Sequence, residues 1–193
     1  MDRRELALAI FTAAMVLAVG MLAGVLVTVV LSLFLVALRA AQPRRTLLAR
    51  IPGTDSFRSV DGVADMTEEP GLVIYRFDAP LFFANADLLA SDVLAAVAEG
   101  AAPPIRWAVI DAEMIGEVDS TGAAMLADLV EDLRRRGITL ALARLKAPVA
   151  DHLSRAGVME KLGAERVYLE VDDAVDAFRA AAPVPAPPGA DGG

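Results

Sequence analysis

The sequence predicts an α/β domain with a mainly parallel or mixed sheet covered by helices, preceded by a two-helix hairpin in a membrane. Three observations predict this fold class. The stretch from Leu6 to Leu38 contains no ionisable residue, which is typical of a segment that lies in lipid. From residue 57 onward, short runs rich in Val, Ile and Leu alternate with amphipathic stretches, and such alternation favours right-handed crossovers and parallel strands. The whole chain is 56% hydrophobic, above the usual range for a soluble domain.

The apolar N-terminal stretch is too long for one straight membrane span. Its length of about 33 residues would give a helix of ~50 Å, whereas the hydrocarbon core of a bilayer is ~30 Å thick. A break costs least at Gly20–Gly24, near the middle, so we predict a membrane segment over residues 1–42 made of two short helices, 6–19 and 24–38. A single tilted helix that packs through its two glycines is the alternative. A secretory signal is disfavoured, because the stretch far exceeds the apolar region of a signal peptide.

Basic residues flank the apolar stretch at both ends. The flank that follows it has no acid and holds four arginines: Arg39, Arg44, Arg45 and Arg50. The positive-inside rule places this flank, and everything after it, in the cytoplasm. Arg3 and Arg4 prefer the same side, which a hairpin satisfies and a single span does not. We therefore expect a protein of the inner (plasma) membrane, in contact with the lipid bilayer, whose folded domain is cytoplasmic.

The rest of the chain divides into a linker, a domain and a tail. Residues 43–56 are predicted to form a linker, residues 57–181 the folded domain, and residues 182–193, mostly Pro, Ala and Gly, a disordered tail. The expected strands are 57–60, 72–77 with a continuation at 81–83, 105–111, 138–143 and 167–169. The expected helices are 86–99 with Asn85 as N-cap, one that ends before Gly137, 148–156, 158–163 and 172–181.

The central stretch of the domain joins a buried strand to an amphipathic helix. Ile105–Asp111 is rich in Ile and Val and follows two prolines, as expected for a buried strand. Asp119-Ser120-Thr121-Gly122 then precedes the helix, whose apolar residues recur at helical spacing: Ala123, Leu126, Val130 and Leu133. Ser or Thr before a helix is most often an N-cap, but the helix dipole would also favour an added phosphate there. Both roles stay open for Ser120 and Thr121.

Composition excludes several classes of function. The absence of Cys excludes disulfides, thiolate nucleophiles and Cys-ligated metals, and a formal net charge of -8 argues against nucleic acid as a partner. His152 is the single histidine, which is too few for a zinc site or a His-based triad. We interpret Asp111, Glu113, Glu117 and Asp119 as solvated loop acids, because no lysine or histidine accompanies them. We expect neither an enzyme nor a protein that holds a cofactor or a metal.

The strand that ends at Asp111, followed by Asp119-Ser120-Thr121-Gly122 and a helix, resembles the STAS domain. This module is shared by bacterial anti-sigma-factor antagonists and the cytoplasmic tails of SulP-type anion transporters. The resemblance to the antagonists implies that Ser120 is a phospho-acceptor. In the transporter tails the pattern is Asp-x-Thr-Gly, which Asp119, Thr121 and Gly122 match. These four residues therefore form the candidate phospho-acceptor or partner-binding loop.

Other runs are similar to the SulP family specifically. They are Pro52-Gly53-Thr54, the stretch from Arg76 to Ala86 with its Pro-Leu-Phe-Phe-Ala-Asn-Ala sequence, Ala141–Arg144, and the membrane glycines Gly20 and Gly24. The resemblance extends from Glu5 to about Phe178. It implies the last membrane helices and the STAS domain of an inorganic-anion transporter, of the kind that moves sulfate, bicarbonate or related oxyanions.

The resemblance also implies a role and a set of partners. In such carriers the STAS domain supports assembly, trafficking and regulation. This chain lacks the membrane segments that form the anion site, so we expect a truncated or split product that does not transport alone. It would associate with the remaining membrane segments of a transporter, with a second copy of itself, or with a cytoplasmic regulatory protein. The alternative is a membrane-tethered phospho-switch, like the antagonists, that binds a kinase or an anti-sigma factor through the loop at Ser120.

Overall fold

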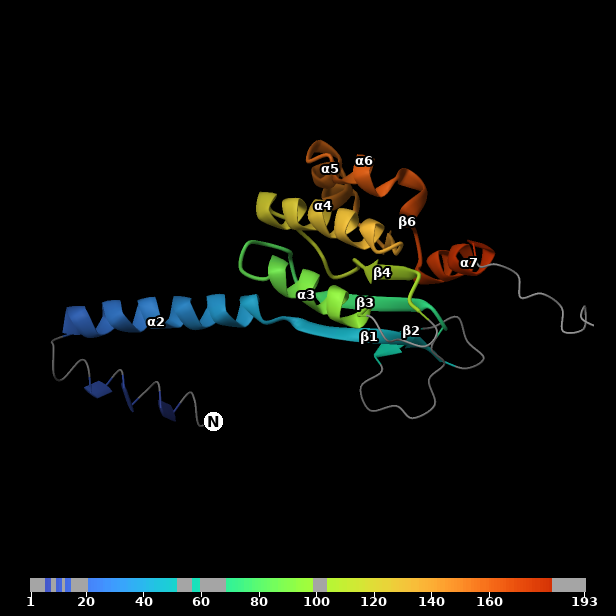
Figure 1. Cartoon of the computed structure of the whole chain (residues 1–193). Helices are drawn as coiled ribbons and strands as arrows, with labels where there is room; N and C mark the ends of the chain where they lie inside the picture. The colour runs from blue at the N-terminus through green and yellow to red at the C-terminus, as the bar shows by residue number, and fades with distance from the viewer. Residues whose placement is uncertain are drawn as a thin grey trace, which may run out of the picture. The chain divides into compact units, whose positions relative to one another are not determined.

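The computed structural model describes residues 6–7, 10–11, 13–14, 21–51, 57–59, 69–98 and 104–181 (Figure 1). The chain divides into two compact units, Met1–Gln42 and Pro43–Gly193. Gly20, several residues of the predicted first membrane helix and the predicted disordered tail at 182–193 lie outside the described residues.

The first unit contains helix α2, Met21–Ala41. This helix includes the predicted stretch 24–38, and Gly24 is helical. Large apolar side chains are exposed at successive positions around it, among them Leu22, which is 86% exposed, Leu26, Leu33 and Val36. Within the described part of the chain, no helix has both the length and the apolar character needed to cross a membrane.

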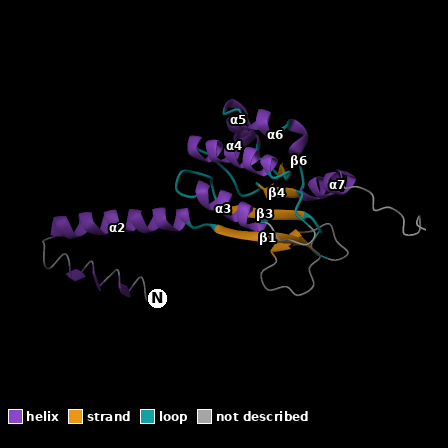
Figure 2. Ribbon diagram, viewed as in Figure 1, coloured by secondary structure: helices purple, strands orange, loops and turns teal. Residues whose placement is uncertain are grey.

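The second unit is built on a six-stranded mixed sheet with the order β2-β1-β3-β4-β5-β6 (Figure 2). The strands are β1 Arg44–Arg50, β2 Phe57–Ser59, β3 Leu72–Asp78, β4 Trp107–Asp111, β5 Thr139–Ala143 and β6 Val167–Tyr168. Strands β3 to β6 pair in parallel, and β1 pairs antiparallel with both β2 and β3. The predicted α/β class and mixed sheet are thereby confirmed.

Strand β1 corrects the predicted linker at residues 43–56. Arg44 to Leu47 pair with Asp78 to Tyr75 of β3, and Leu48 and Ala49 are buried in the domain. The sequence predicts a linker here because the run carries three arginines and adjoins the apolar stretch. Long arginine side chains can run along the sheet surface and end at an acid, as Arg45 does at Asp92. An arginine-rich segment can therefore form an interior strand of the sheet.

Helices cover both faces of the sheet. They are α3 Ala86–Ala96, α4 Ser120–Arg135, α5 Ala147–Arg155, α6 Val158–Leu162, the 3-10 turn η1 Ala164–Arg166 and α7 Val171–Ala181. One core lies between the sheet and α3 to α6, and the other lies between the sheet and α7. All five residues of β4 are buried. Ala108 and Ile110 contribute to the first core and Trp107 and Val109 to the second, as the period of two along a strand requires.

Two predicted details of the region after β3 are wrong. Leu81–Phe83 does not continue the strand, because Leu81 makes an isolated parallel bridge with Val118 after the chain has turned. Asn85 precedes α3 as predicted, but its side chain does not cap the helix. Its amide instead closes the turn before the helix, where it accepts a hydrogen bond from the Phe82 N–H and donates one to the Pro80 carbonyl.

Candidate functional site

The candidate loop lies at the start of α4, where Asp119 is the N-cap. Its Oδ1 accepts a hydrogen bond from the Gly122 N–H at 2.7 Å, and its Oδ2 accepts one from the Phe83 N–H at 3.0 Å. One carboxylate thus satisfies a free N–H of the first helical turn and holds the segment after β3. The capping role that the sequence left open for Ser120 and Thr121 belongs to Asp119.

The two hydroxyl residues are exposed in the first turn of α4. Neither hydroxyl has a hydrogen-bond partner among the residues that the structure describes. Phe83 is 71% exposed, and its backbone N–H is bonded to Asp119, the residue that precedes them, because residues 81–83 run alongside residues 117–119. Leu81 donates its N–H to the Glu117 carbonyl and accepts from the Asp119 N–H. Phe83, Ser120 and Thr121 together form what we call the Ser120 surface.

Gly122 allows the close contact on which this arrangement depends. A Cβ at this position would lie 3.0 Å from both Leu81 Cγ and the Leu81 carbonyl oxygen, and 3.2 Å from Val118 Cγ1. Such distances are shorter than ordinary van der Waals contacts. Glycine is therefore required here so that the start of α4 can pack against the segment after β3.

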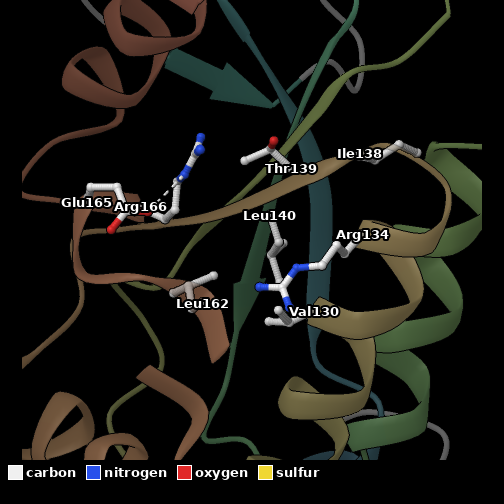
Figure 3. A pocket seen from close by; sticks show the side chains of 8 residues that line it. All are labelled: Val130, Arg134, Ile138, Thr139, Leu140, Leu162, Glu165 and Arg166. Carbon is white, nitrogen blue, oxygen red and sulfur yellow. Dashed lines mark ion pairs between the residues drawn. The ribbon is translucent and has the colours of Figure 1, made fainter. Parts of the chain in front are cut away.

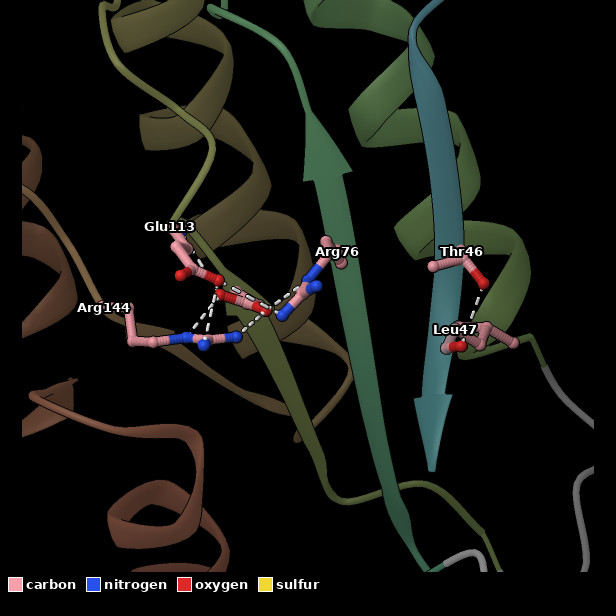
Figure 4. Close-up of polar contacts among 6 residues, drawn as sticks. Thr46, Leu47, Arg76, Glu113 and Arg144 are labelled. Atoms are coloured by element: carbon pink, nitrogen blue, oxygen red, sulfur yellow. Dashed lines mark hydrogen bonds and ion pairs between the residues drawn. The ribbon is translucent and has the colours of Figure 1, made fainter. Parts of the chain in front are cut away.

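Beside the loop, a buried acid joins three parallel strands (Figure 4). Asp111, at the end of β4, is 0% exposed. It accepts hydrogen bonds from Arg76 Nε of β3 at 2.7 Å and from Arg144 Nε, just after β5, at 3.0 Å. Glu113 completes the network, 3.3 Å from Arg76 Nη2 and 2.9 Å from Arg144 Nη1. We call these four residues the Asp111 network.

Arg144 is held in an unusual state by this network. Its φ of 57° lies in the left-handed region, which is uncommon for a residue other than glycine and costs free energy. Partial burial acts to lower the pKa of its guanidinium, but the hydrogen bonds and charge of Asp111, with the charge of Glu113, outweigh burial and raise that pKa above its ordinary value. The charge on Arg144 is thus fixed, and it compensates the buried carboxylate.

The Asp111 network corrects the interpretation of Asp111 and Glu113 as solvated loop acids; Asp119 is instead the N-cap of α4, and Glu117 is exposed. No lysine or histidine lies near these acids along the chain, whereas the two arginines come from neighbouring strands. Arg76 is the register partner of Asp111 in β3, and Arg144 follows Ala143, its partner in β5. An Arg at the end of each flanking parallel strand is the signal that could have located the network. No group of three His, Asp or Glu residues suited to a metal ion occurs among the described residues.

A mixed sheet with an acid-capped Ser-Thr-Gly turn after a central buried strand defines the class of this domain. The family model "STAS domain" matches residues 63–174, so the chain belongs to the STAS domain family. A probable sulfate transporter of Mycobacterium tuberculosis is 38% identical over 177 residues, which are 92% of this chain and 31% of that protein. The chain thus spans about a third of the length of that relative.

Solved structures agree with this assignment at the level of the fold. The murine Slc26a9 anion transporter in its inward-facing state superposes with a TM-score of 0.83 at 22% identity, over 93% of this chain and 29% of that one. A candidate anti-sigma factor antagonist from Thermotoga maritima reaches a TM-score of 0.50 at 16% identity, over 58% of this chain and 92% of that one. Both likenesses concern the fold alone. Sequence identity over almost the whole chain therefore favours the sulfate-transporter side of the family over the antagonists.

Proposed function

We propose that this chain is the regulatory and assembly portion of a SulP-type inorganic-anion transporter, for sulfate or a bicarbonate-like anion. The observation that carries the proposal is the 38% identity to a probable sulfate transporter, which extends over 92% of the chain and so includes residues of both units. The chain acts together with further membrane segments or with a second copy of itself, and it does not transport alone.

Anion uptake tests this proposal directly. Cells that lack the chain should take up less radiolabelled sulfate or bicarbonate, and the wild-type chain should restore uptake. Purified residues 1–193 alone in lipid vesicles should move neither anion, because they correspond to about a third of the length of the related transporter. Unchanged uptake of both anions in the deficient cells would refute the proposal, and transport by the purified chain would refute its second half.

The membrane anchor within this proposal is a hairpin with both ends in the cytoplasm. It is supported by the absence of ionisable residues between Leu6 and Leu38 and by the apolar side chains exposed around α2. The chain has no native Cys, so single cysteines at Asp2 and Gln42 can be labelled cleanly. Both should be protected from a membrane-impermeant thiol reagent in intact cells and react after lysis. Labelling at Asp2 from outside would leave a single span.

The partner-binding role within this proposal belongs to the Ser120 surface. Its support is that an exposed aromatic residue, Phe83, is joined through its backbone to Asp119, next to two exposed hydroxyl residues, because exposed apolar groups near polar ones are common at binding sites. Phe83→Ala should weaken association with the membrane-embedded partner and leave the melting temperature nearly unchanged. Leu47→Ala, at an exposed apolar residue of β1, is the matched control.

The exposed Ser120 supports a second candidate function, that of a phospho-switch. A phosphate there would add roughly -1.5 to -2 charge at the start of α4, which the helix dipole favours and Asp119 opposes. Under this alternative, phosphate is found on Ser120 in protein from the native host. Ser120→Asp then abolishes partner binding while Ser120→Ala retains it. Equal binding by both variants supports the transporter role.

A further inference from the structure

Two large apolar residues are exposed at the edge of the sheet where the parallel strands end. Met114, which follows β4, is 51% exposed, and Leu169, which directly follows β6, is 85% exposed. With Phe83, which follows β3, they are the three most exposed large apolar residues in the described part of the second unit. A folded domain buries most such side chains, so their exposure at one edge indicates a binding surface.

Arg144 joins the segments that carry Met114 and Leu169. Its backbone N–H donates a hydrogen bond to the carbonyl of Tyr168, the residue before Leu169, at 3.0 Å. Its Nη1 lies 2.9 Å from a carboxylate oxygen of Glu113, the residue before Met114 (Figure 4). The Asp111 network therefore holds the two segments next to each other.

The charge around these residues is negative. The Asp111 network is neutral as a whole, because its two arginines balance its two acids. Glu117 and Glu170 are exposed, and neither carboxylate has an ion pair among the described residues. Lys146 is an exposed cation of the same edge, but it offsets only one of these two charges. We call the following group the Leu169 surface: Met114, Glu117, Leu169 and Glu170.

Strand β1 begins at this same edge. Arg44, its first residue, pairs with Asp78, the last residue of β3. The apolar stretch of residues 6–38 precedes β1 in the sequence, so it is attached to the second unit at this edge. Cytoplasmic loops of membrane proteins carry an excess of Lys and Arg. Such a loop has the charge that complements Glu117 and Glu170.

We propose that the Leu169 surface binds a basic cytoplasmic loop of the membrane segments that complete the transporter. Lys or Arg side chains of the loop pair with Glu117 and Glu170, and its apolar side chains cover Met114 and Leu169. This assignment rests on the proposed function and adds the chemistry of the partner, which combines basic and apolar groups. Residues 113–119 connect this surface to the Ser120 surface, so one partner can contact both.

A peptide of the sequence Leu-Arg-Leu-Arg-Leu-Arg tests the surface on the full-length protein in phosphatidylcholine nanodiscs. Calorimetric titration should detect saturable binding that weakens as sodium chloride is added, because salt screens exposed charges. Leu-Glu-Leu-Glu-Leu-Glu has the opposite charge, and Ser-Arg-Ser-Arg-Ser-Arg lacks the apolar groups, so both should bind more weakly. Empty nanodiscs supply the baseline. Binding of either control peptide as tight as that of the first peptide overturns the proposal.

Variants of the surface identify the groups that bind. Glu117→Lys combined with Glu170→Lys should weaken binding of the Leu-Arg peptide about 10-fold, because two attractive charges become repulsive. Leu169→Ala should weaken binding about 5-fold, because the peptide then covers less apolar surface. Unchanged affinity in both variants overturns the assignment.

Two matched controls lie elsewhere on the domain. Glu160→Lys makes the same change of charge at an exposed residue of α6. Glu160 adjoins Lys161, whose carbonyl accepts a hydrogen bond from Arg134 in the last turn of α4, beside a small pocket (Figure 3). Leu47→Ala removes an exposed apolar side chain of β1. Both controls should bind the peptide like the wild type, and losses equal to those of the surface variants overturn the assignment.

The peptide titration and the uptake assay fail separately. Reduced anion uptake in the deficient cells together with no peptide binding overturns the Leu169 surface and leaves the transport role standing. Peptide binding with the expected pattern of variants, together with unchanged uptake, refutes the transport role and supports the surface as a site for basic segments.

Discussion

At the scale of single residues, Asp119 has the most specific structural role in the candidate site. Its two oxygens are both occupied, one by the first turn of α4 and the other by the Phe83 backbone. The hydroxyls that follow are therefore not needed to hold the helix in place. Ser120 and Thr121 remain available to a partner or to a modifying enzyme.

The stability of the loop should therefore depend on the acid and not on the hydroxyls. Asp119→Ala should lower the free energy of unfolding by about 0.5–2 kcal/mol, toward the upper end because the Phe83 N–H also loses its acceptor. Ser120→Ala and Thr121→Ala should each change it by less than about 0.5 kcal/mol. Urea unfolding of the three variants measures the difference. A loss in Ser120→Ala as large as that in Asp119→Ala would contradict the capping assignment.

Tyr75 should make the stability of the domain depend on pH in the alkaline range. Burial, then the hydrogen bond that its hydroxyl donates to Asp92 at 2.6 Å and the charge of Asp92, raise its pKa above the ordinary value of 10.0. The pKa of Tyr75 is higher in the folded than in the unfolded state. The contribution of its protonated hydroxyl to the free energy of unfolding is therefore complete below pH ~10 and decreases as pH rises from there. Burial also raises the pKa of Tyr168, the second tyrosine.

Spectrophotometric titration tests this pH dependence. Tyrosinate absorbance of the folded protein should appear at higher pH than for free tyrosine, with Tyr75 the later of the two to ionise. Tyr75→Phe should remove the later step and flatten the decline in unfolding free energy above pH ~10. Tyr168→Phe is the control that should remove the earlier step. Ionisation of both residues at pH ~10 in the folded state would show that the hydrogen bond to Asp92 has no such effect.

At the scale of elements, the spacing of apolar residues along the chain predicts most of the strands and helices. The apolar runs that became β3, β4 and β5, and the stripe of Ala123, Leu126, Val130 and Leu133 in α4, are local patterns that burial selects directly. Strand β1 could not be predicted from the sequence, because its pairing with β3 depends on residues about 30 positions away along the chain. Its arginines have no local pattern that separates a strand from a basic membrane flank.

The candidate site, likewise, could be predicted from the sequence only in part. The stretch from Asp119 to Gly122 is contiguous and could be recognised in the sequence, although the assignment of the cap to Asp119 required the geometry. The Asp111 network could not be recognised, because Asp111 is 35 residues from Arg76 and 33 from Arg144. Only the parallel register brings the three side chains together.

The Asp111 network should be the most sensitive polar contact of the sheet. Arg144→Ala leaves a buried carboxylate with one cation fewer, and removal of a partner from a buried ion pair costs ~3–5 kcal/mol. The loss should approach that range without exceeding it, because Arg76 still compensates Asp111. Arg135→Ala, which removes an exposed pair with Asp132, should cost less than about 1 kcal/mol. Equal losses in the two variants, measured by chemical unfolding, would contradict a buried network.

At the scale of the whole molecule, the second unit carries a complete core. Both core clusters consist of residues from Leu48 onward, and the sheet begins at Arg44. The folded domain therefore begins before β1 and not at residue 57, the boundary predicted from the sequence.

Truncation at two points tests this boundary. A chain that begins at Pro43 should unfold cooperatively, because it retains the whole sheet and both cores. A chain that begins at Pro52 lacks β1, so β3 becomes an open edge and Leu48 no longer covers the second core. Its melting temperature should be clearly lower, or the transition should lose cooperativity. Equal melting of the two chains would show that β1 is dispensable.

The order of the strands has a consequence for how the protein is made. From β3 to β6, neighbours in the sheet are also neighbours along the chain, so each strand leaving the ribosome finds its partner already in place. The sheet can then grow outward at one edge without a gap that waits for a later segment, and premature pairing is disfavoured. Ribosome-stalled chains that end after Gly137, followed by an unstructured extension long enough to fill the exit tunnel, should already protect β3 and β4 from protease, before β5 has been synthesised.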